Sequence, residues 1–248
     1  MKRTVVLSDL QCPYMDRKAV DAVSDFIEQY KPDVVACVGD EADLPMLGRW
    51  TRGLKGEFSG DIAKHRDITV EVLRQLQVDV ISRSNHGDRL WNSIATRLPG
   101  LMGLPELTYE AFFRHEELGI TFAREPYPLA KNTVLMHGDE GSTSRHAGMT
   151  AHGLSVRTGK SVICGHTHRM GLIPFTEMVG AKVQRIRWSM EVGHLIDIRT
   201  SGMAYMKGSA NWQAGFGLLI EEGNTVVPIP VPIINKSFIV DGTRFAWK

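Results

Sequence analysis

The stretch TVVLSDLQ, residues 4–11, decides how the rest of the chain is interpreted. Four residues without polar alternation are followed at once by a serine and an aspartate, Asp9. A short continuous apolar run is typical of a strand that is buried on both faces of a sheet. We therefore predict a strand over residues 4–7 whose carboxyl end delivers Asp9.

A helix and a second apolar strand follow. Asp16 is predicted to cap a helix that reaches about Tyr30 and ends before Pro32, because apolar residues recur there at helical spacing. The segment PDVVACVGD, residues 32–40, again lacks alternation. This strand–helix–strand order predicts a parallel sheet with helices covering it.

Further elements extend the pattern. Residues 61–77 predict a helix, and VDVIS, residues 78–82, predicts a third strand. Residues 98–106 predict a loop broken by Pro and Gly, and residues 108–118 a short amphipathic helix. Two more buried strands are expected in TVLMHG (133–138) and SVICGH (161–166). After residue 170, short runs between Gly and Pro predict a second, mostly antiparallel sheet: GHLIDI (193–198), FGLLIEEG (216–223), TVVPIPVPI (225–233) and SFIVDG (237–242).

The composition limits the class of protein. The chain has 248 residues, 43% of them hydrophobic, which suits one well-buried domain over residues 1–248. A formal charge of +1 indicates no general affinity for nucleic acid or membranes. Three cysteines without a framework spacing predict a reducing, cytoplasmic location. No apolar run is long enough for a signal peptide or a membrane span.

Polar residues of metal-binding type follow the predicted strands. Each alone is more often a turn or cap residue, but several together at the carboxyl ends of strands predict one crevice. Carboxylate, amide and imidazole donors suit Mn, Fe, Zn or Mg better than a metal that prefers thiolates, and a set of this size can hold two ions. The residues are Asp9, Asp40, Asn85, His86, His137, His166 and His168.

In this order the motifs resemble the calcineurin-like metallophosphoesterase family, whose signature runs D-x-H, G-D-x-x-D, G-N-H-(D/E), H and G-H-x-H. The resemblance covers about residues 4 to 170 and implies a four-layer αββα sandwich. The stretch SANWQAGFG (209–217) also resembles phage-encoded members. The matching segments are SDLQ (8–11), GDEAD (39–43), SNHGD (84–88), MHGD (136–139) and GHTH (165–168).

The resemblance implies two metal sites. Asp40 would bridge both ions. Asp9 and His168 would complete the first site, with Gln11 where the family usually has histidine. The second site would be completed by Asn85, His137 and His166. We expect two divalent ions, Mn first, with Fe, Zn, Ni or Mg as alternatives. A neutral amide is a weaker donor than imidazole, so Gln11 predicts a weaker first site.

The resemblance also implies catalytic residues. His86 would contact phosphate and help protonate the leaving group, and Asp43 would orient a ligand or His86. The family's acidic residue after His86 is displaced here by Gly87 to Asp88, which is the alternative orienting group. The family's glycine is Ser84.

Substrate contacts are expected from Arg49, Trp50 and Arg89. The first two belong to GRWTRGLKGEF, residues 48–58, which is basic with interleaved aromatics and could bind a phosphate backbone or stack a base. A solvated loop is the equal alternative. His146 and His152 could line the crevice or lie in an exposed loop. We expect structural or surface positions for the remaining candidates, His65, His115 and His194.

The sequence thus predicts a phosphodiesterase with two metals that acts on nucleotides or nucleic acid, including nuclease activity, through a metal-activated hydroxide. A phosphomonoesterase on the same scaffold is the alternative, for a nucleotide or a phosphoprotein. A third hypothesis is a binding scaffold that has lost activity; Gln11 makes it possible, and the presence of His86, Asp40 and GHTH argues against it. The oligomeric state stays open.

Overall fold

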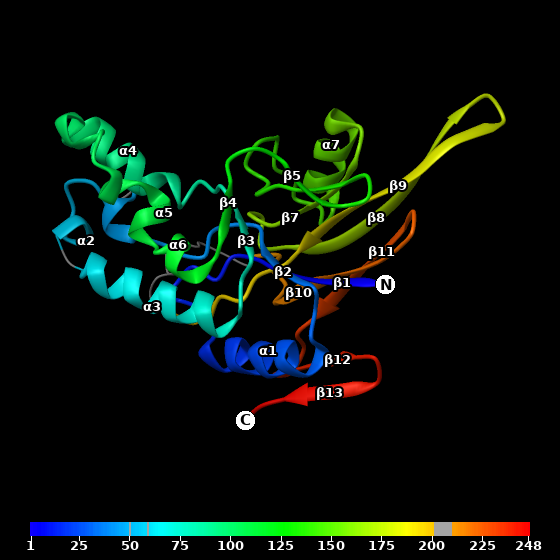
Figure 1. Ribbon diagram of the computed structural model, residues 1–248, viewed down its shortest axis with the longest axis horizontal. Coiled ribbons are helices and arrows are strands. Elements are labelled where there is room, and N and C mark those ends of the chain that lie inside the picture. Colours follow the sequence, from blue (N-terminus) through cyan, green and yellow to red (C-terminus); the bar gives the residue numbers. More distant parts are fainter. Residues whose placement is uncertain (50, 59, 201–209) are drawn as a thin grey trace.

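The computed structural model describes residues 1–49, 51–58, 60–200 and 210–248. Two β-sheets are stacked between helices, and a long hairpin projects from the body (Figure 1). The first sheet has the order β11-β10-β1-β2-β3-β4 and the second β5-β6-β7-β9-β8. Strand bounds are β1 (Lys2–Leu7), β2 (Val34–Cys37), β3 (Val80–Ser82), β4 (Thr121–Ala123), β5 (Tyr127–Ala130), β6 (Thr133–Leu135), β7 (Ser161–Cys164), β8 (Met170–Val179), β9 (Lys182–Val192), β10 (Gly215–Glu222), β11 (Thr225–Pro232), β12 (Ser237–Val240) and β13 (Thr243–Ala246).

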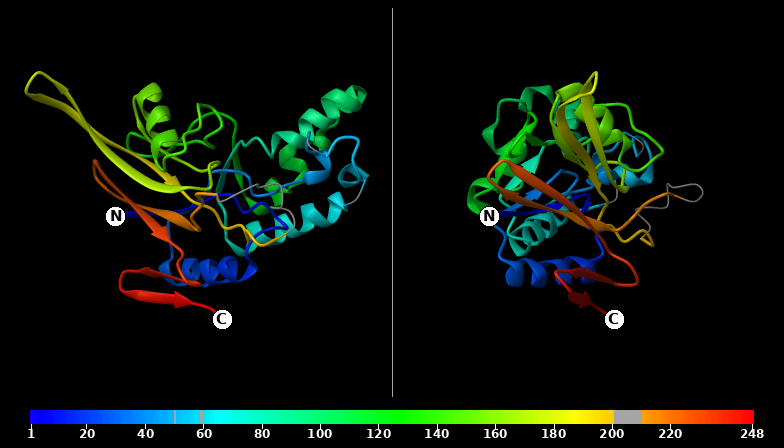
Figure 2. Two further views of the ribbon diagram at one scale, coloured as in Figure 1. Left: turned by 180° about the vertical axis from the view of Figure 1, so that it is seen from behind. Right: turned by 90° about the vertical axis from the view of Figure 1, so that its right-hand side faces the viewer.

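Helices cover both outer faces of the sheet pair. Helix α1 and the β12–β13 hairpin lie on one side and α7 on the other (Figures 1 and 2). Short 3₁₀ turns occupy Pro45–Leu47, Pro99–Leu101 and Pro105–Leu107. The α-helices are α1 (Arg17–Tyr30), α2 (Lys55–Phe58), α3 (Ile62–Gln75), α4 (Asp88–Arg97), α5 (Tyr109–Phe112), α6 (His115–Leu118) and α7 (Met149–Thr158).

Three buried cores join the four layers. On β1, Val5 and Leu7 pack against α1 while Val6 packs between the two sheets. On β7, Ile163 lies in that same central core and Val162 faces α7. Because each strand buries both of its faces, its residues are continuously apolar, as predicted. The four-layer αββα sandwich is therefore confirmed.

The N-terminal predictions hold closely. Strands β1, β2 and β3 pair in parallel. The Asp16 side chain caps α1 by accepting hydrogen bonds from the backbone N–H groups of Lys18 and Ala19. The helix ends at Lys31, whose φ of 50° lies in the left-handed region. The cap and the end of the helix depend on neighbouring residues, so the sequence pattern is sufficient to predict them.

The prediction for the last third was wrong in its strand pairing. Strand β10 pairs antiparallel with β1, and β11 pairs with β10, so both join the first sheet rather than the second. The physical reason is burial. Strand β10 buries Leu218 in the core beside α1 and Leu219 between the two sheets, and the strand itself covers the edge of β1 that would otherwise be open. The segment 193–198 makes only isolated bridges, and β12 pairs with β13.

The second sheet is mixed rather than mostly antiparallel. Strands β6, β7 and β9 run parallel to one another, and β5 and β8 flank them antiparallel. The strand TVLMHG and the strand SVICGH are both in it. They therefore bring their trailing histidines from a different sheet than Asp9 and Asp40.

Some helices also differ from expectation. The helix expected over 108–118 is two short helices, because Arg114 adopts a φ of 55° between them. The loop at 98–106 contains two 3₁₀ turns. Helices α4 and α7 were not predicted. Within the described residues, none of the helices is both long and apolar enough to cross a lipid bilayer.

Candidate metal centre and phosphoester site

The predicted ligands come together in one crevice. Asp9, Asp40 and Asn85 follow strands β1, β2 and β3 of the first sheet, whereas His137 and His166 follow β6 and β7 of the second. The carboxyl ends of parallel strands meet at one edge of a sheet, and here the two edges face each other. The crevice contains a cavity of about 190 Å³, lined by Gln11, Asp40, Asn85, His86, His166, Thr167, His168 and Trp212.

The loops that carry the ligands have an unusual backbone. Asp9, Gln11, Asp40, His166 and His168 have φ values of 46°, 44°, 53°, 66° and 57°. Non-glycine residues rarely adopt this left-handed region, and such strain gathers at functional sites. Strand geometry ends at Leu7, so Gln11 reaches the cavity through this loop and not by strand alternation.

Close backbone approach explains the glycine of the GHTH motif. A Cβ on Gly165 would lie 2.1 Å from Ser8 Oγ and 2.6 Å from Asp9 Oδ2. Any side chain there would push the two sheets apart at the site. The motif therefore needs glycine because the loop after β7 passes directly over the loop after β1.

The candidate for the second metal site is built around His137, which is fully buried. Its Nδ1 lies 2.9 Å from the Val38 carbonyl oxygen, to which it donates a hydrogen bond. Its Nε2 is then aimed at two oxygens, Asn85 Oδ1 at 2.9 Å and Asp40 Oδ2 at 3.5 Å. Donor atoms of Asp40, His137 and His166 all lie within 4.8 Å of one another. This set fits a divalent cation with oxygen and imidazole ligands.

The electrostatics of this group also suit a cation. Burial disfavours a charged imidazole, but the Asp40 carboxylate outweighs it and raises the pKa of His137 to about 10. Burial likewise disfavours the Asp40 carboxylate, yet His137 and His86 hold the pKa of Asp40 well below its usual value. A negative carboxylate thus holds a proton on His137 at the point where a metal ion would replace it.

The first site is less complete. Asp9 is fully buried, its Oδ1 lies 3.1 Å from His168 Nε2, and its Oδ2 accepts the backbone N–H of His166 at 3.0 Å. The Gln11 Nε2 atom lies 3.2 Å from the same His168 nitrogen. The Gln11 Oε1 atom is buried and has no hydrogen-bond partner among the described residues. An unsatisfied buried amide oxygen beside a carboxylate and an imidazole fits a metal ligand.

His86 lies at the rim of the cluster of candidate metal ligands. Its Nδ1 lies 2.8 Å from Asp43 Oδ1, and its Nε2 lies 2.9 Å from Arg89 Nη2. The Arg89 guanidinium also donates to Asp43 Oδ1 at 3.1 Å. The His86 backbone N–H donates to Asp40 Oδ1 at 3.1 Å, which ties this residue to the shared carboxylate.

The structure places the other predicted residues as follows. Asp88 pairs with Arg83, which also contacts Asp139 at 2.9 Å, so the group that faces His86 is Asp43. Arg49 is exposed, and neither Arg49 nor Arg89 is among the residues that line the cavity. Trp50 lies outside the described residues.

The histidines outside the motifs fall into different environments. His115 is buried beside Tyr109. His146 is exposed, whereas His152 lies on α7 against Phe175. His194 is buried with its ring 5.7 Å from that of His168, so this expected structural histidine adjoins the site.

Sequence reasoning missed a buried support under the GHTH loop. The Thr167 hydroxyl donates to Glu191 Oε2 at 2.7 Å, and Glu191 Oε1 accepts the backbone N–H of Thr150 at 2.9 Å in the first turn of α7. Glu191 is fully buried. The signal in the sequence that could have revealed this support is Glu191 itself, a single acidic residue within the strand-like run RWSMEVGH. The carboxylate links α7, β9 and the loop that carries two histidines.

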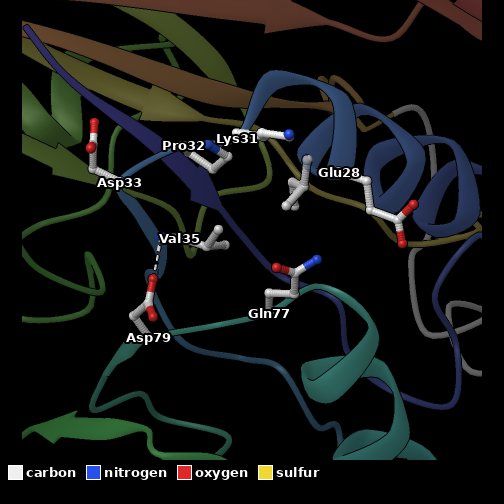
Figure 3. A pocket seen from close by; sticks show the side chains of 8 residues that line it. Glu28, Lys31, Pro32, Asp33, Val35, Gln77 and Asp79 are labelled. Carbon is white, nitrogen blue, oxygen red and sulfur yellow. Dashed lines mark hydrogen bonds between the residues drawn. The ribbon is translucent and has the colours of Figure 1, made fainter.

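A larger cavity lies elsewhere and lacks such chemistry. It has a volume of about 410 Å³ and is lined by residues such as Asp33 and Asp79, just before β2 and β3 begin (Figure 3). Two of its acidic residues serve the fold, since Asp79 accepts the Val35 N–H at 2.7 Å and Asp33 accepts the Arg3 N–H at 2.7 Å. The candidate site is therefore the smaller cavity.

Two phage proteins are similar to the chain over almost its whole length. The gene 54 protein of Mycobacterium phage D29 is 37% identical over 251 residues, covering 97% of each chain. The gene 54 protein of Mycobacterium phage L5 is 36% identical, with the same coverage. The chain belongs to the gene 54 family of these phages. No protein-family model matches the chain.

Solved structures are similar at a lower level. Vps29 from Chaetomium thermophilum has a TM-score of 0.49 and 11% identity, with 99% of each chain covered. Yfce, a phosphoesterase from E. coli, has a TM-score of 0.37 and 15% identity, with 98% of this chain and 97% of that chain covered. The stacked sheets of this gene 54 family member form the αββα sandwich that its resemblance to the calcineurin-like metallophosphoesterases implies.

We predict unequal metal affinities in this gene 54 family member, with the first site weaker because Gln11 offers an amide oxygen. Replacing Gln11 by histidine should tighten that site by about tenfold or more, which corresponds to about 1.4 kcal/mol. Titration calorimetry with Mn²⁺ measures both sites. Gln29→His on the exposed face of α1 is the matched control. Two equally tight sites before and after the Gln11 change would contradict this role.

Proposed function

We propose that this protein is a dinuclear-metal phosphodiesterase that acts on nucleotides or nucleic acid. The observation that carries the proposal is the position of Asp40. Its carboxylate lies within 3.5 Å of His137 Nε2 and 3.8 Å of His86 Nε2, and it lines the same cavity as Gln11 and His168. Asp40 thus adjoins His137 of one proposed donor set and shares the cavity with Gln11 and His168 of the other, which is the position that a carboxylate shared by two ions on one phosphate requires.

The residues present fit two ions. Asp9, Gln11 and His168 would hold the first, and Asn85, His137 and His166 the second, with Asp40 shared. When bound, such ions supply hydroxide at neutral pH and neutralise charge on phosphoryl oxygens. The protein orients these ligands through buried hydrogen bonds, such as that from His137 Nδ1 to the Val38 carbonyl oxygen.

His86 has the geometry for proton transfer. Asp43, 2.8 Å from Nδ1, fixes the orientation of the ring, which lines the cavity, and Nε2 accepts a hydrogen bond from Arg89 Nη2 at 2.9 Å. Once Arg89 turns from Nε2 to a phosphoryl oxygen, Nε2 can carry a proton and give it to the leaving oxygen as the bond between that oxygen and phosphorus breaks. Arg89, 2.9 Å from Nε2, is placed to bind a phosphoryl oxygen beside it.

A phosphomonoesterase is the second candidate. The small cavity of about 190 Å³ favours it, because a terminal phosphate needs little room. The guanidinium of Arg89 could bind the additional charged oxygen of a monoester.

The test compares two reporters in Mn²⁺-supplemented protein: bis(4-nitrophenyl) phosphate and 4-nitrophenyl phosphate, with single-stranded DNA alongside. We expect faster diester hydrolysis, complete loss on chelation and recovery on adding Mn²⁺ back. Faster monoester hydrolysis would favour the second candidate. Full activity in the metal-free protein would exclude the metal mechanism, and inactivity with both ions bound would indicate a binding scaffold.

A further inference from the structure

One wall of the candidate cavity is an indole that none of the motifs contains. Trp212 lines the cavity together with Asp40, Asn85, His86 and His166. It lies on the segment that leads into β10, far along the chain from every predicted ligand. Each of the other lining side chains ends in a carboxylate, an amide, an imidazole or a hydroxyl. Among these cavity-lining residues, Trp212 therefore offers the largest apolar surface.

The indole is held in place. Its ring lies edge-to-face against His168, with centroids 4.2 Å apart and an interplanar angle of 79°, and it also contacts His194 at 5.9 Å. The next residue, Gln213, donates its backbone N–H to the His168 carbonyl oxygen at 2.9 Å. The Gln213 side-chain oxygen accepts the Met170 N–H at 3.1 Å. The ring is thus fixed before any ligand arrives.

The cavity has a polar part and an apolar part, and this arrangement indicates which part of a substrate Trp212 contacts. The polar side chains suit a phosphate and the ions that bind it, so the organic group of the ester must extend beyond them. A fixed, half-buried indole at that margin binds flat aromatic groups by stacking or edge contacts.

We propose that Trp212 is a specificity-determining residue that recognises the flat ring next to the scissile phosphate, a nucleobase in the biological substrate. This inference rests on the proposed phosphoesterase function and names its substrate class. It assigns the aromatic contact to Trp212, whereas the sequence had suggested Trp50.

Two diesters with the same leaving group test the proposal. Thymidine 5′-(4-nitrophenyl) phosphate and methyl 4-nitrophenyl phosphate differ only in the group that remains on phosphorus. In Mn²⁺-loaded wild-type protein we expect a higher kcat/KM for the thymidine ester. Trp212→Leu should lower the thymidine-to-methyl ratio of kcat/KM by about ten- to a hundredfold, the value of one aromatic stacking contact. Trp212→Phe should retain most of the ratio.

Trp91→Leu, on the exposed face of α4, is the matched control and should leave the ratio as in wild type. A second measurement does not depend on turnover: calorimetric Kd values for thymidine 5′-monophosphate and methyl phosphate, with metal content determined on the same samples. Trp212→Leu should weaken the thymidine ligand more, by the same factor.

Equal losses for both ligands in Trp212→Leu would overturn the proposal, since they would mean that the indole only supports His168. A wild-type ratio near one would overturn it too. If neither diester is hydrolysed, the phosphodiesterase proposal fails separately, and the two Kd values still decide the role of Trp212.

Discussion

Replacing Asp40 by asparagine is expected to lower phosphodiester turnover by more than about 10³-fold. This is a larger loss of rate than removal of one hydrogen-bond donor that stabilises the transition state usually causes. The reason is that Asp40 is the carboxylate shared by both proposed metal sites: its Oδ2 faces His137 Nε2 at 3.5 Å, and it lines one cavity with Gln11 and His168. Asparagine keeps the shape but removes the charge that the ions share. Metal analysis should show the loss of at least one ion.

Two controls accompany this variant. Asp25→Asn, exposed on α1, should retain turnover and metal. Circular dichroism and thermal unfolding of Asp40→Asn separate loss of metal from loss of fold, because a buried ion pair is being broken. An Asp40→Asn protein that is folded, retains both ions and turns over normally would remove Asp40 from the mechanism.

Replacing His86 by alanine should lower turnover by roughly 10²–10⁴-fold, the usual range for a group that transfers a proton. Both metal ions should stay bound, because His86 lies at the rim and its Nδ1 faces Asp43 at 2.8 Å. Metal content is measured on the same sample as activity. If the ions leave together with activity, His86 is a ligand and the role proposed here is wrong.

The leaving group provides a sharper readout for His86. An ester of 4-nitrophenol needs little help from an acid, whereas a nucleoside leaving group needs a proton. The loss in His86→Ala should therefore be larger for the second kind of ester. Equal losses would favour a role in phosphate binding alone. His146→Ala, at an exposed position, is the control and should leave both rates unchanged.

Much of the site could be predicted because its signals are local. A buried strand followed by a polar donor is readable at each of the five motifs, and α1 shows its own cap at Asp16. Three features could not be predicted in this way. Glu191 supports the GHTH loop through hydrogen bonds to Thr167 and to the first turn of α7, and Trp212 reaches the site through its ring contact with His168. Both depend on contacts between residues that are distant in the chain. The pairing of β10 with β1 also depends on a distant partner.

The amino-acid sequence by itself determined the candidate donor residues, the order of the motifs, the first parallel strands and the presence of Gln11 where the family resemblance leads us to expect histidine. These properties depend on residue chemistry and on short-range periodicity. Only the tertiary structure decided that His137 and His166 reach Asp40 from a second sheet, and that Asp43 faces His86. It also placed Trp212 in the cavity wall. The physical reason is that such contacts join residues far apart in the chain, and they are selected by the burial of whole strand faces rather than by any local preference.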